Sequence, residues 1–355
     1  MTTAFDPIDL SGTQLGNRIA MAPMTRSRAH GEGLTVTDST VEYYGQRASA
    51  GLIITEGIQP SVIGQGYPNT PGLHSAEQVA AWRKVTDAVH AEGGKIFAQI
   101  MHAGRIGHPV LFPDGQVSVA PSAVAAAGQL YTHEGPKDFI APRELSGDEV
   151  RATVGEFVEA ARNAIEAGFD GVELHGANGY LIHQFLAPNT NLRTDEWGGS
   201  VENRIRFAVE VTKAVAAAIG AERTGLRISP GNPYNDIAET DSEKVYPALV
   251  QELEPLGLGY LHIVETDPGL RDVTLALRKQ FSGTFILNPA TEGPTDHRAL
   301  GLIEDGIADI LAFGALFLAN PDLPVRLKTE GPYNTPDTAS FFGGDDKGYI
   351  DYPTL

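Results

Sequence analysis

Apolar runs of strand length recur along the chain, and each is followed by a segment whose apolar residues have helical spacing. Runs that are apolar at successive positions, rather than at alternate ones, are typical of parallel strands covered on both faces. We expect eight such strands, at Ile19–Met24, Gly51–Thr55, Ile96–Met101, Phe169–Leu174, Thr224–Ser229, Tyr260–Val264, Phe285–Leu287 and Asp309–Phe313.

The segments between these runs carry helix start signals. Three of them have the spacing of a capping box, in which a Ser or Thr precedes a Glu or Gln by three positions. The pairs are Ser75 with Gln78, Ser146 with Glu149, and Thr240 with Glu243. We therefore expect a helix to begin at each of these three places.

Eight strand–helix units predict an α/β fold, a closed (β/α)8 TIM barrel. A small N-terminal hairpin is expected within Ile8–Asn17. A long insertion, Ala103–Leu145, follows the third strand, and a loop of this length is usually a lid or a specificity element. A doubly wound open sheet would be expected to carry a phosphate fingerprint, and neither GxGxxG nor GxxxxGK[ST] occurs. We expect residues 1–355 to form a single domain.

The composition limits the choice of partners. With 45 acidic and 26 basic residues the net charge is −19, which argues against nucleic acid and anionic membranes. Cysteine is absent, which excludes thiolate catalysis and cysteine-ligated metals. No secretory signal or membrane-spanning apolar run is visible, so we expect a cytoplasmic protein. We expect small-molecule partners and a monomer or small homo-oligomer.

In a TIM barrel the functional side chains lie at the C-terminal ends of the strands. Side-chain alternation then predicts that Thr25, Gln99, His175 and Arg227 meet at the barrel mouth. An arginine inside an apolar strand needs an anion, because an unpaired buried charge is costly. Two possibilities stay open at this point: a buried ion pair with Glu173, or a ligand that carries or develops negative charge.

The stretch Phe169–Gly199 carries the most distinctive polar residues. His175, Asn178 and Tyr180 follow one another within six positions, directly after the fourth predicted strand. Two hydrogen-bond donors beside a phenol can hold a polarised oxygen and supply a proton. Each residue alone also has a structural explanation, as a satisfied strand-end histidine, a turn asparagine or a core tyrosine. Their convergence on one end of the barrel favours chemistry.

Several long motifs resemble one family. They are MAPMTRSR at Met21–Arg28, YYGQRASAGLIITEG at Tyr43–Gly57, PGLHS at Pro71–Ser75, AQIMHAGR at Ala98–Arg105, ELHGANGYLIHQFL at Glu173–Leu186, RTDEWGGSVENRIRF at Arg193–Phe207, LRISP at Leu226–Pro230, ANPDLPVRL at Ala319–Leu327, and GYIDYPTL at the C-terminus. Over essentially its whole length the chain resembles the old yellow enzyme family of FMN-dependent NAD(P)H ene-reductases. The resemblance implies reduction of the C=C bond of α,β-unsaturated carbonyl or nitro compounds, with NAD(P)H as reductant.

The resemblance also implies roles for single residues. His175 and Asn178 would hold the substrate oxygen, and His175 would also border the cofactor. Tyr180 would protonate the α-carbon, while flavin N5 gives hydride to the β-carbon. Tyr67 and Tyr349 would shape the substrate pocket. The flavin ring would be bordered by Pro23, Met24, Thr25 and Gly57, with Gln99 and Arg227 on its N1–C2=O–N3 side.

Two departures from the family pattern change these expectations. Met101 stands where family members often have tryptophan, which predicts a wider substrate pocket. Ala315 stands where the family commonly has an arginine that binds the FMN phosphate, and Pro289 offers no N–H nearby. The phosphate would have to rest on N–H groups around Ala290, Gly314 and Ala315. Loss of one charge-assisted contact predicts roughly ten- to a hundredfold weaker FMN retention.

Three alternatives remain at the level of sequence. The same residues suit a reductase of nitrate esters or nitro compounds. The altered phosphate end is compatible with a barrel that has lost FMN and acts as a binding protein. A metal-dependent hydrolase or aldolase using His175 and Glu173 is the third, although no second histidine ligand is evident on an adjacent strand. No fingerprint separates NADH from NADPH.

Overall fold

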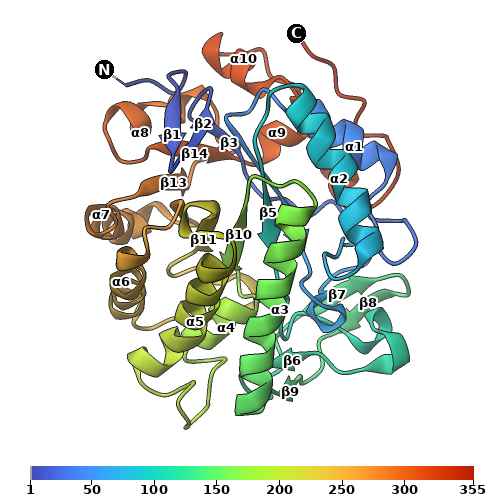
Figure 1. The fold of residues 1–355 in the computed structure, drawn as a ribbon, viewed down its shortest axis with the longest axis vertical. Helices are drawn as coiled ribbons and strands as arrows, with labels where there is room; N and C mark the ends of the chain where they lie inside the picture. Colours follow the sequence, from blue (N-terminus) through green and yellow to red (C-terminus); the bar gives the residue numbers. More distant parts are fainter. Residues whose placement is uncertain (1) are drawn as a thin grey trace.

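The structure is a computed structural model that describes residues 2–355, so Met1 of the predicted single domain lies outside the described residues. Eight parallel strands close into a barrel surrounded by helices, which confirms the predicted TIM barrel (Figure 1). In chain order the barrel strands are β3 (Ile19–Met21), β4 (Leu52–Ile58), β5 (Ile96–Ile100), β10 (Gly171–Gly176), β11 (Thr224–Ile228), β12 (Tyr260–Val264), β13 (Thr284–Asn288) and β14 (Ile310–Phe313). Pairing of β14 with β3 closes the ring.

Only β12 has the predicted bounds at both ends, and the largest differences, of three residues, are at the ends of β3 and β4. β3 ends at Met21 rather than Met24, because Pro23 has no N–H with which to continue the ladder. β4 continues past Thr55 to Ile58, with an irregular register between Ile54 and Gly57. This longer β4 carries Gly57 to the same level as Gln99 on β5.

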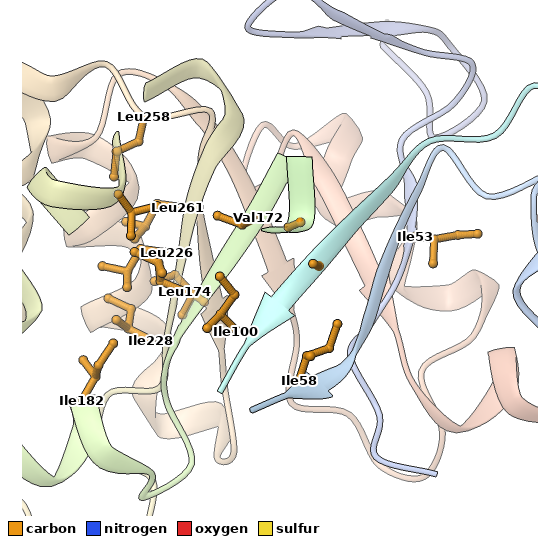
Figure 2. Close-up of a cluster of buried hydrophobic side chains, with 14 of the residues drawn as sticks. Ile53, Ile58, Ile100, Val172, Leu174, Ile182, Leu226, Ile228, Leu258 and Leu261 are labelled. Carbon is orange, nitrogen blue, oxygen red and sulfur yellow. The ribbon is translucent and has the colours of Figure 1, made fainter. Parts of the chain in front are cut away.

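The α-helices surround the barrel and form the outer layer. They are α1 (Asp38–Gly45), α2 (Ala76–Ala91), α3 (Gly147–Glu166), α4 (Leu181–Leu186), α5 (Val201–Ile219), α6 (Ser242–Leu253), α7 (Arg271–Gln280), α8 (Gly301–Glu304), α9 (Ala315–Ala319) and α10 (Leu323–Lys328). Outward-facing strand residues such as Ile53, Val172 and Leu226 belong to the large core that the barrel shares with these helices (Figure 2). Among residues 2–355, no helix has the length and apolar character needed to cross a membrane.

Two of the three predicted capping boxes are present. Ser75 and Ser146 each accept a hydrogen bond from the backbone of the N3 residue, and the N3 side chain bonds back. The third prediction is wrong, because α6 begins only at Ser242. Its N-cap residue, Asp241, has its carboxylate engaged by Arg204 of α5 and makes no side-chain cap.

The predicted N-terminal hairpin is present as β1 (Ile8–Leu10) paired with β2 (Thr13–Leu15). Its Leu10 and Leu15 pack with inward-facing strand residues such as Leu52 and Phe97. Burial of these apolar side chains closes the end of the barrel at which the strands begin. The hairpin (blue) and the insertion after β5 (teal) lie at opposite ends of the barrel in Figure 1.

The predicted insertion is present between β5 and α3. It holds β6 (Val119–Ala120) paired with β9 (Arg143–Glu144), and an antiparallel pair, β7 (Gln129–Thr132) with β8 (Gly135–Asp138). Its apolar residues Ala103, Ile106 and Ala126 form a small cluster against which Tyr67 and Tyr180 pack. The insertion thereby forms part of the surroundings of the tyrosine that the sequence singles out.

Candidate active site

The strand ends bring three of the predicted residues together. The register aligns Gln99 of β5 with Glu173 of β10, and His175 of β10 with Arg227 of β11. The Gln99 Nε2 lies 3.2 Å from His175 Nδ1. Gln99, His175 and Arg227 thus lie together at the barrel mouth, as the alternation of side chains predicts.

Thr25 lies in the chain that leaves the same end of β3. Pro23, Met24 and Thr25 are each partly exposed, between buried Ala22 and Arg26. These three partly exposed side chains, in the otherwise buried segment that follows β3, form a surface that a ligand at the barrel mouth can contact. No hydrogen bond joins Thr25 to Gln99, His175 or Arg227.

A buried carboxylate organises the floor of the site. Glu173 accepts hydrogen bonds from Gln99 Nε2 at 2.8 Å, Tyr260 OH at 3.1 Å and His262 Nδ1 at 2.8 Å. Burial alone would raise the pKa of Glu173, but His262, Arg227 and Gln99 together hold it below its usual value. Glu173 is therefore an anion whose hydrogen-bonding capacity is used by groups other than Arg227.

Arg227 is the buried cation of the site, with 4% of its surface exposed. Its Nη2 donates to Asn288 Oδ1 at 3.0 Å, and its Nε is buried without a partner. Within residues 2–355, no carboxylate lies within 4.0 Å of its guanidinium. Of the two possibilities that the sequence leaves open for Arg227, the direct ion pair with Glu173 is absent. The charge of Glu173 acts on Arg227 only from a distance.

His175 is oriented by Gln99. An amide N–H directed at Nδ1 makes that nitrogen the acceptor, which leaves the imidazole proton on Nε2. Burial, reinforced by the charge of Arg227, holds the pKa of His175 well below its usual value. His175 is consequently a neutral hydrogen-bond donor at pH 7, and its ring lies 5.2 Å from that of Tyr180, centroid to centroid.

Asn178 adopts a left-handed backbone conformation with φ 56°, which asparagine tolerates better than most residues. Its N–H donates to Ser229 Oγ at 3.0 Å, and its carbonyl accepts from Asn235 Nδ2 at 2.7 Å. Its side-chain Oδ1 accepts from Asn232 Nδ2 at 2.8 Å. With the oxygen engaged in this way, the Asn178 Nδ2 is the group left to donate to a ligand.

Gly179, which follows, has to be glycine. Its φ is +77°, and a Cβ there would lie 2.6 Å from the carbonyl oxygen of Tyr234. Its N–H donates to Nδ1 of the buried His183, whose Nε2 lies 3.1 Å from Glu239 Oε1. The loop that presents Asn178 is thus fixed from both sides.

Tyr180 and Tyr67 form a phenol pair. Their hydroxyl oxygens are 2.8 Å apart and their rings meet edge to face. Burial raises the pKa of Tyr180, and burial together with Tyr180 raises that of Tyr67 well above its usual value. Both phenols therefore carry their protons at neutral pH, beside His175.

Met101 and Gly57 are in close contact at the ends of β5 and β4. A Cβ on Gly57 would lie 2.7 Å from Met101 Sδ, so glycine is what lets this side chain approach the strand. Met101 is buried. A larger residue at position 57 would displace it.

Tyr349 is placed differently from the prediction. It is fully buried, stacked on Tyr43 at 4.2 Å, with the guanidinium groups of Arg26 and Arg28 at 5.0 and 4.5 Å from its ring. A side chain without exposed surface does not line an open pocket. This corrects the expectation that Tyr349 shapes the substrate pocket, since its contacts anchor the C-terminal tail.

The same tail brings in residues that sequence reasoning missed. Arg26 Nε donates to the Phe341 carbonyl at 2.9 Å, and Gly343 N–H donates to the Arg26 carbonyl at 2.8 Å. Phe341 and the 67% exposed Phe342 thereby lie beside the strand exit that carries Thr25. The sequence feature that could have indicated these residues is the pair of adjacent aromatic side chains in an otherwise polar tail.

The residues expected at the phosphate end border one cavity. Ala290, Gly314 and Ala315 border a cavity of about 330 Å³ at the ends of β12, β13 and β14. Asn288, the partner of Arg227, borders it too, so the cavity adjoins the barrel mouth. The Ala290 N–H is directed at Glu265 Oε2 at 3.4 Å, which the sequence did not indicate.

A metal centre has no donor set here. Among residues 2–355, no group of three His, Asp or Glu side chains is arranged to hold a metal ion. His175 and Glu173 are both hydrogen-bonded to Gln99.

Comparison with known proteins gives a consistent assignment. Residues 3–334 match the model of the NADH:flavin oxidoreductase / NADH oxidase family. The putative 12-oxophytodienoate reductase 2 of Oryza sativa subsp. japonica is 42% identical, over 98% of this chain and 93% of its own. A probable flavin mononucleotide-dependent alkene reductase of Leishmania infantum is 41% identical, over 98% of this chain and 96% of its own.

Solved structures agree. Morphinone reductase superposes with a TM-score of 0.93 at 41% identity, covering 99% of this chain and 96% of that one. The old yellow enzyme homologue from Zymomonas mobilis gives a TM-score of 0.94 at 40% identity, covering 100% of both chains. The chain therefore belongs to the NADH:flavin oxidoreductase / NADH oxidase family, the old yellow enzymes that its motifs resemble.

Proposed function

We propose that this protein is an FMN-dependent NAD(P)H ene-reductase that reduces the C=C bond of α,β-unsaturated carbonyl or nitro compounds. The observation that carries the proposal is Arg227, a buried arginine without a carboxylate partner, beside Gln99 and His175. A buried cation of this kind is stabilised by a ligand on which negative charge develops. Family membership supports a flavin as that ligand.

The ring-end residues fit a flavin. Both amide protons of Gln99 are directed at Glu173 and His175, which leaves its carbonyl oxygen to accept from a ring N–H. The Arg227 guanidinium would hold the N1–C2=O side of the ring, where its charge would stabilise the reduced form. Pro23, Met24, Thr25 and Gly57 would border the ring, as the family pattern implies. A bound flavin supplies hydride to the β-carbon of the substrate.

His175 and Asn178 form the proposed clamp on the substrate oxygen. His175 offers its Nε2–H and Asn178 its Nδ2 amide group, because the other polar atom of each side chain is engaged by Gln99 or Asn232. Donors already fixed where negative charge develops stabilise the transition state without reorganisation. A neutral His175 serves this purpose at pH 7 without competing for the acidic proton.

Tyr180 is the proposed acid for the α-carbon. Its phenol is protonated at neutral pH, and Tyr67 OH lies 2.8 Å away. We propose that Tyr67 both positions the Tyr180 hydroxyl and passes its proton to it after each turnover, while Tyr67 regains a proton from water. The insertion, which packs on both tyrosines, would act as the lid of this pocket, and Met101 would border the substrate.

NAD(P)H is the proposed reductant, and we propose that residues 1–355 act as one catalytic domain. The family description names NADH, and the related morphinone reductase has been solved in complex with tetrahydroNAD. Since the coenzyme and the alkene would both be recognised at the barrel mouth, they would bind in turn and not together.

The proposal is tested with the purified full chain incubated with FMN under anaerobic conditions. The flavin absorbance should bleach on addition of NADH or NADPH and return on addition of cyclohexenone, with a nitroalkene and a nitrate ester tested in parallel. In Tyr180→Phe, bleaching should keep its rate while recovery slows. A protein that binds no flavin would refute the proposed function, and equal slowing of both steps would refute the role of Tyr180.

A further inference from the structure

The cavity at the ends of β12, β13 and β14 has an unusual chemistry for a phosphate site. It lies where the family pattern puts the phosphate of FMN, and it adjoins Arg227 through Asn288. Its lining residues, all within the described chain, include Glu265 but no Lys, Arg or His. A phosphate prefers charge-assisted hydrogen bonds from cationic side chains or free N–H groups, so the donors available here decide what the cavity accepts.

The nearby cation is already engaged. Arg271 donates to both oxygens of Glu265, at 2.7 and 2.8 Å, and the Glu265 side chain is buried beneath it. The charges of this pair compensate each other, and Arg271 is engaged by Glu265 instead of being free to donate to a ligand in the cavity. A phosphate entering the cavity would meet no free cationic side chain among the described residues of its lining.

Several neutral donors are engaged as well. The Ala290 N–H is directed at Glu265, and prolines at 289 and 294 in the lining have no N–H. The Thr291 hydroxyl donates to the Gly293 carbonyl at 2.9 Å and lies 3.1 Å from that of Thr295. The hydroxyl groups of this loop are thus used within the loop, and the N–H groups of Gly314 and Ala315 at the start of α9 are the neutral donors left for a ligand.

The two ends of the cofactor site therefore differ. Arg227 and Gln99 have unused hydrogen-bonding capacity for the ring, whereas the described lining of the phosphate end has no cationic side chain, and the nearby Arg271 is engaged by Glu265. Resting on the proposed flavin function, we propose that this chain recognises its flavin by the ring and not by the phosphate. It then binds riboflavin, the uncharged form without phosphate, about as tightly as FMN.

Equilibrium titration of the flavin-free full chain with riboflavin and with FMN, followed by quenching of flavin fluorescence, tests this directly. The two dissociation constants should agree within about tenfold. FMN binding more than about a hundredfold tighter than riboflavin would overturn the inference and leave the proposed function standing. Binding of neither flavin would instead refute the proposed function itself.

Two variants localise the effect. Ala315→Arg restores a cation in the cavity lining and should tighten FMN binding by about ten- to a hundredfold, with riboflavin unchanged. Glu265→Gln removes the carboxylate without adding bulk and should also favour FMN alone, which keeps the test valid if the arginine variant fails to fold.

The matched control is Val325→Arg, which adds the same charge at a 50% exposed position of α10 that is not part of the lining. It should change neither dissociation constant. If Ala315→Arg and Glu265→Gln shift both flavins equally, or neither, this cavity is not the phosphate end and the inference is wrong.

Discussion

Asn232 offers a sharp test of the proposed substrate clamp, because its side-chain N–H is directed at Asn178. Its side chain is 1% exposed, its Nδ2 donates to Asn178 Oδ1 at 2.8 Å, and its Oδ1 accepts from the Tyr234 N–H at 2.9 Å. Asn232→Asp keeps the size and the Tyr234 contact but replaces the donor by an oxygen. The Asn178 amide should then turn, so that its Nδ2 faces the introduced carboxylate instead of the substrate.

The size of the effect follows from the new hydrogen bond. To donate to the substrate, Asn178 would have to give up a bond to a charged group, worth about 1.5–3 kcal/mol. This corresponds to about a ten- to a hundredfold slower reoxidation of the flavin by cyclohexenone. The reduction of the flavin by NAD(P)H, for which no oxygen clamp is needed, should change much less.

Stopped-flow measurement of the two half-reactions is the assay, with Asn178→Ala and the double variant alongside. If Asn232 acts through Asn178, the double variant should be no slower than Asn178→Ala, because the second change has nothing left to remove. Additive losses in the double variant would show that Asn232 acts independently. An unchanged reoxidation rate in Asn232→Asp would refute the assigned orientation of the Asn178 amide.

Three further predictions concern the surroundings of the site. Tyr67→Phe removes the 2.8 Å hydrogen bond to Tyr180 OH. It should slow reoxidation of the flavin by about two- to tenfold and leave flavin reduction unchanged. A reoxidation rate equal to that of the wild type would exclude Tyr67 from proton supply. Burial raises the pKa of Glu56 from its ordinary value of 4.5 to about 7. The folded state therefore disfavours the ionised carboxylate, so the free energy of unfolding falls as the pH rises from 4.5 towards 7. Glu56→Gln should therefore raise the melting temperature at pH 8 and not at pH 4, and a pH-independent difference would contradict this sign. Gly179→Ala, with its Cβ 2.6 Å from the Tyr234 carbonyl, should lower the free energy of unfolding by about 1–3 kcal/mol in denaturant titrations and also weaken substrate binding; wild-type behaviour would show that the loop has room.

The barrel could be predicted from sequence because each strand, taken by itself, has the apolar sequence that is typical of a strand buried on both faces. Runs such as Ile310–Phe313 are apolar throughout, and no long-range information is needed to recognise them. The meeting of Gln99, His175 and Arg227 follows almost as directly, since parallel strands end at one side and alternate side chains point inward. Local pattern and fold geometry together were sufficient for that part of the site.

Predictions that depended on chain paths outside the strands were less successful. Tyr349 lies in an irregular tail, and only the folded chain shows that its ring is stacked on Tyr43 rather than exposed at the pocket. The start of α6 moved because Arg204, from another helix, engages Asp241. Neither competing contact leaves a periodic signal in the sequence.

The sequence by itself determined the barrel and the polar residues at its mouth, and the family resemblance indicated that Ala315 stands where an arginine is common. The tertiary structure decided how these groups are partnered. It assigned Glu173 to His262 and Tyr260, leaving Arg227 for a ligand, paired Tyr67 with Tyr180, and placed Glu265 at the cavity. The reason is physical: a polar side chain has few hydrogen-bonding positions, and which neighbour fills them depends on contacts between residues far apart in the chain.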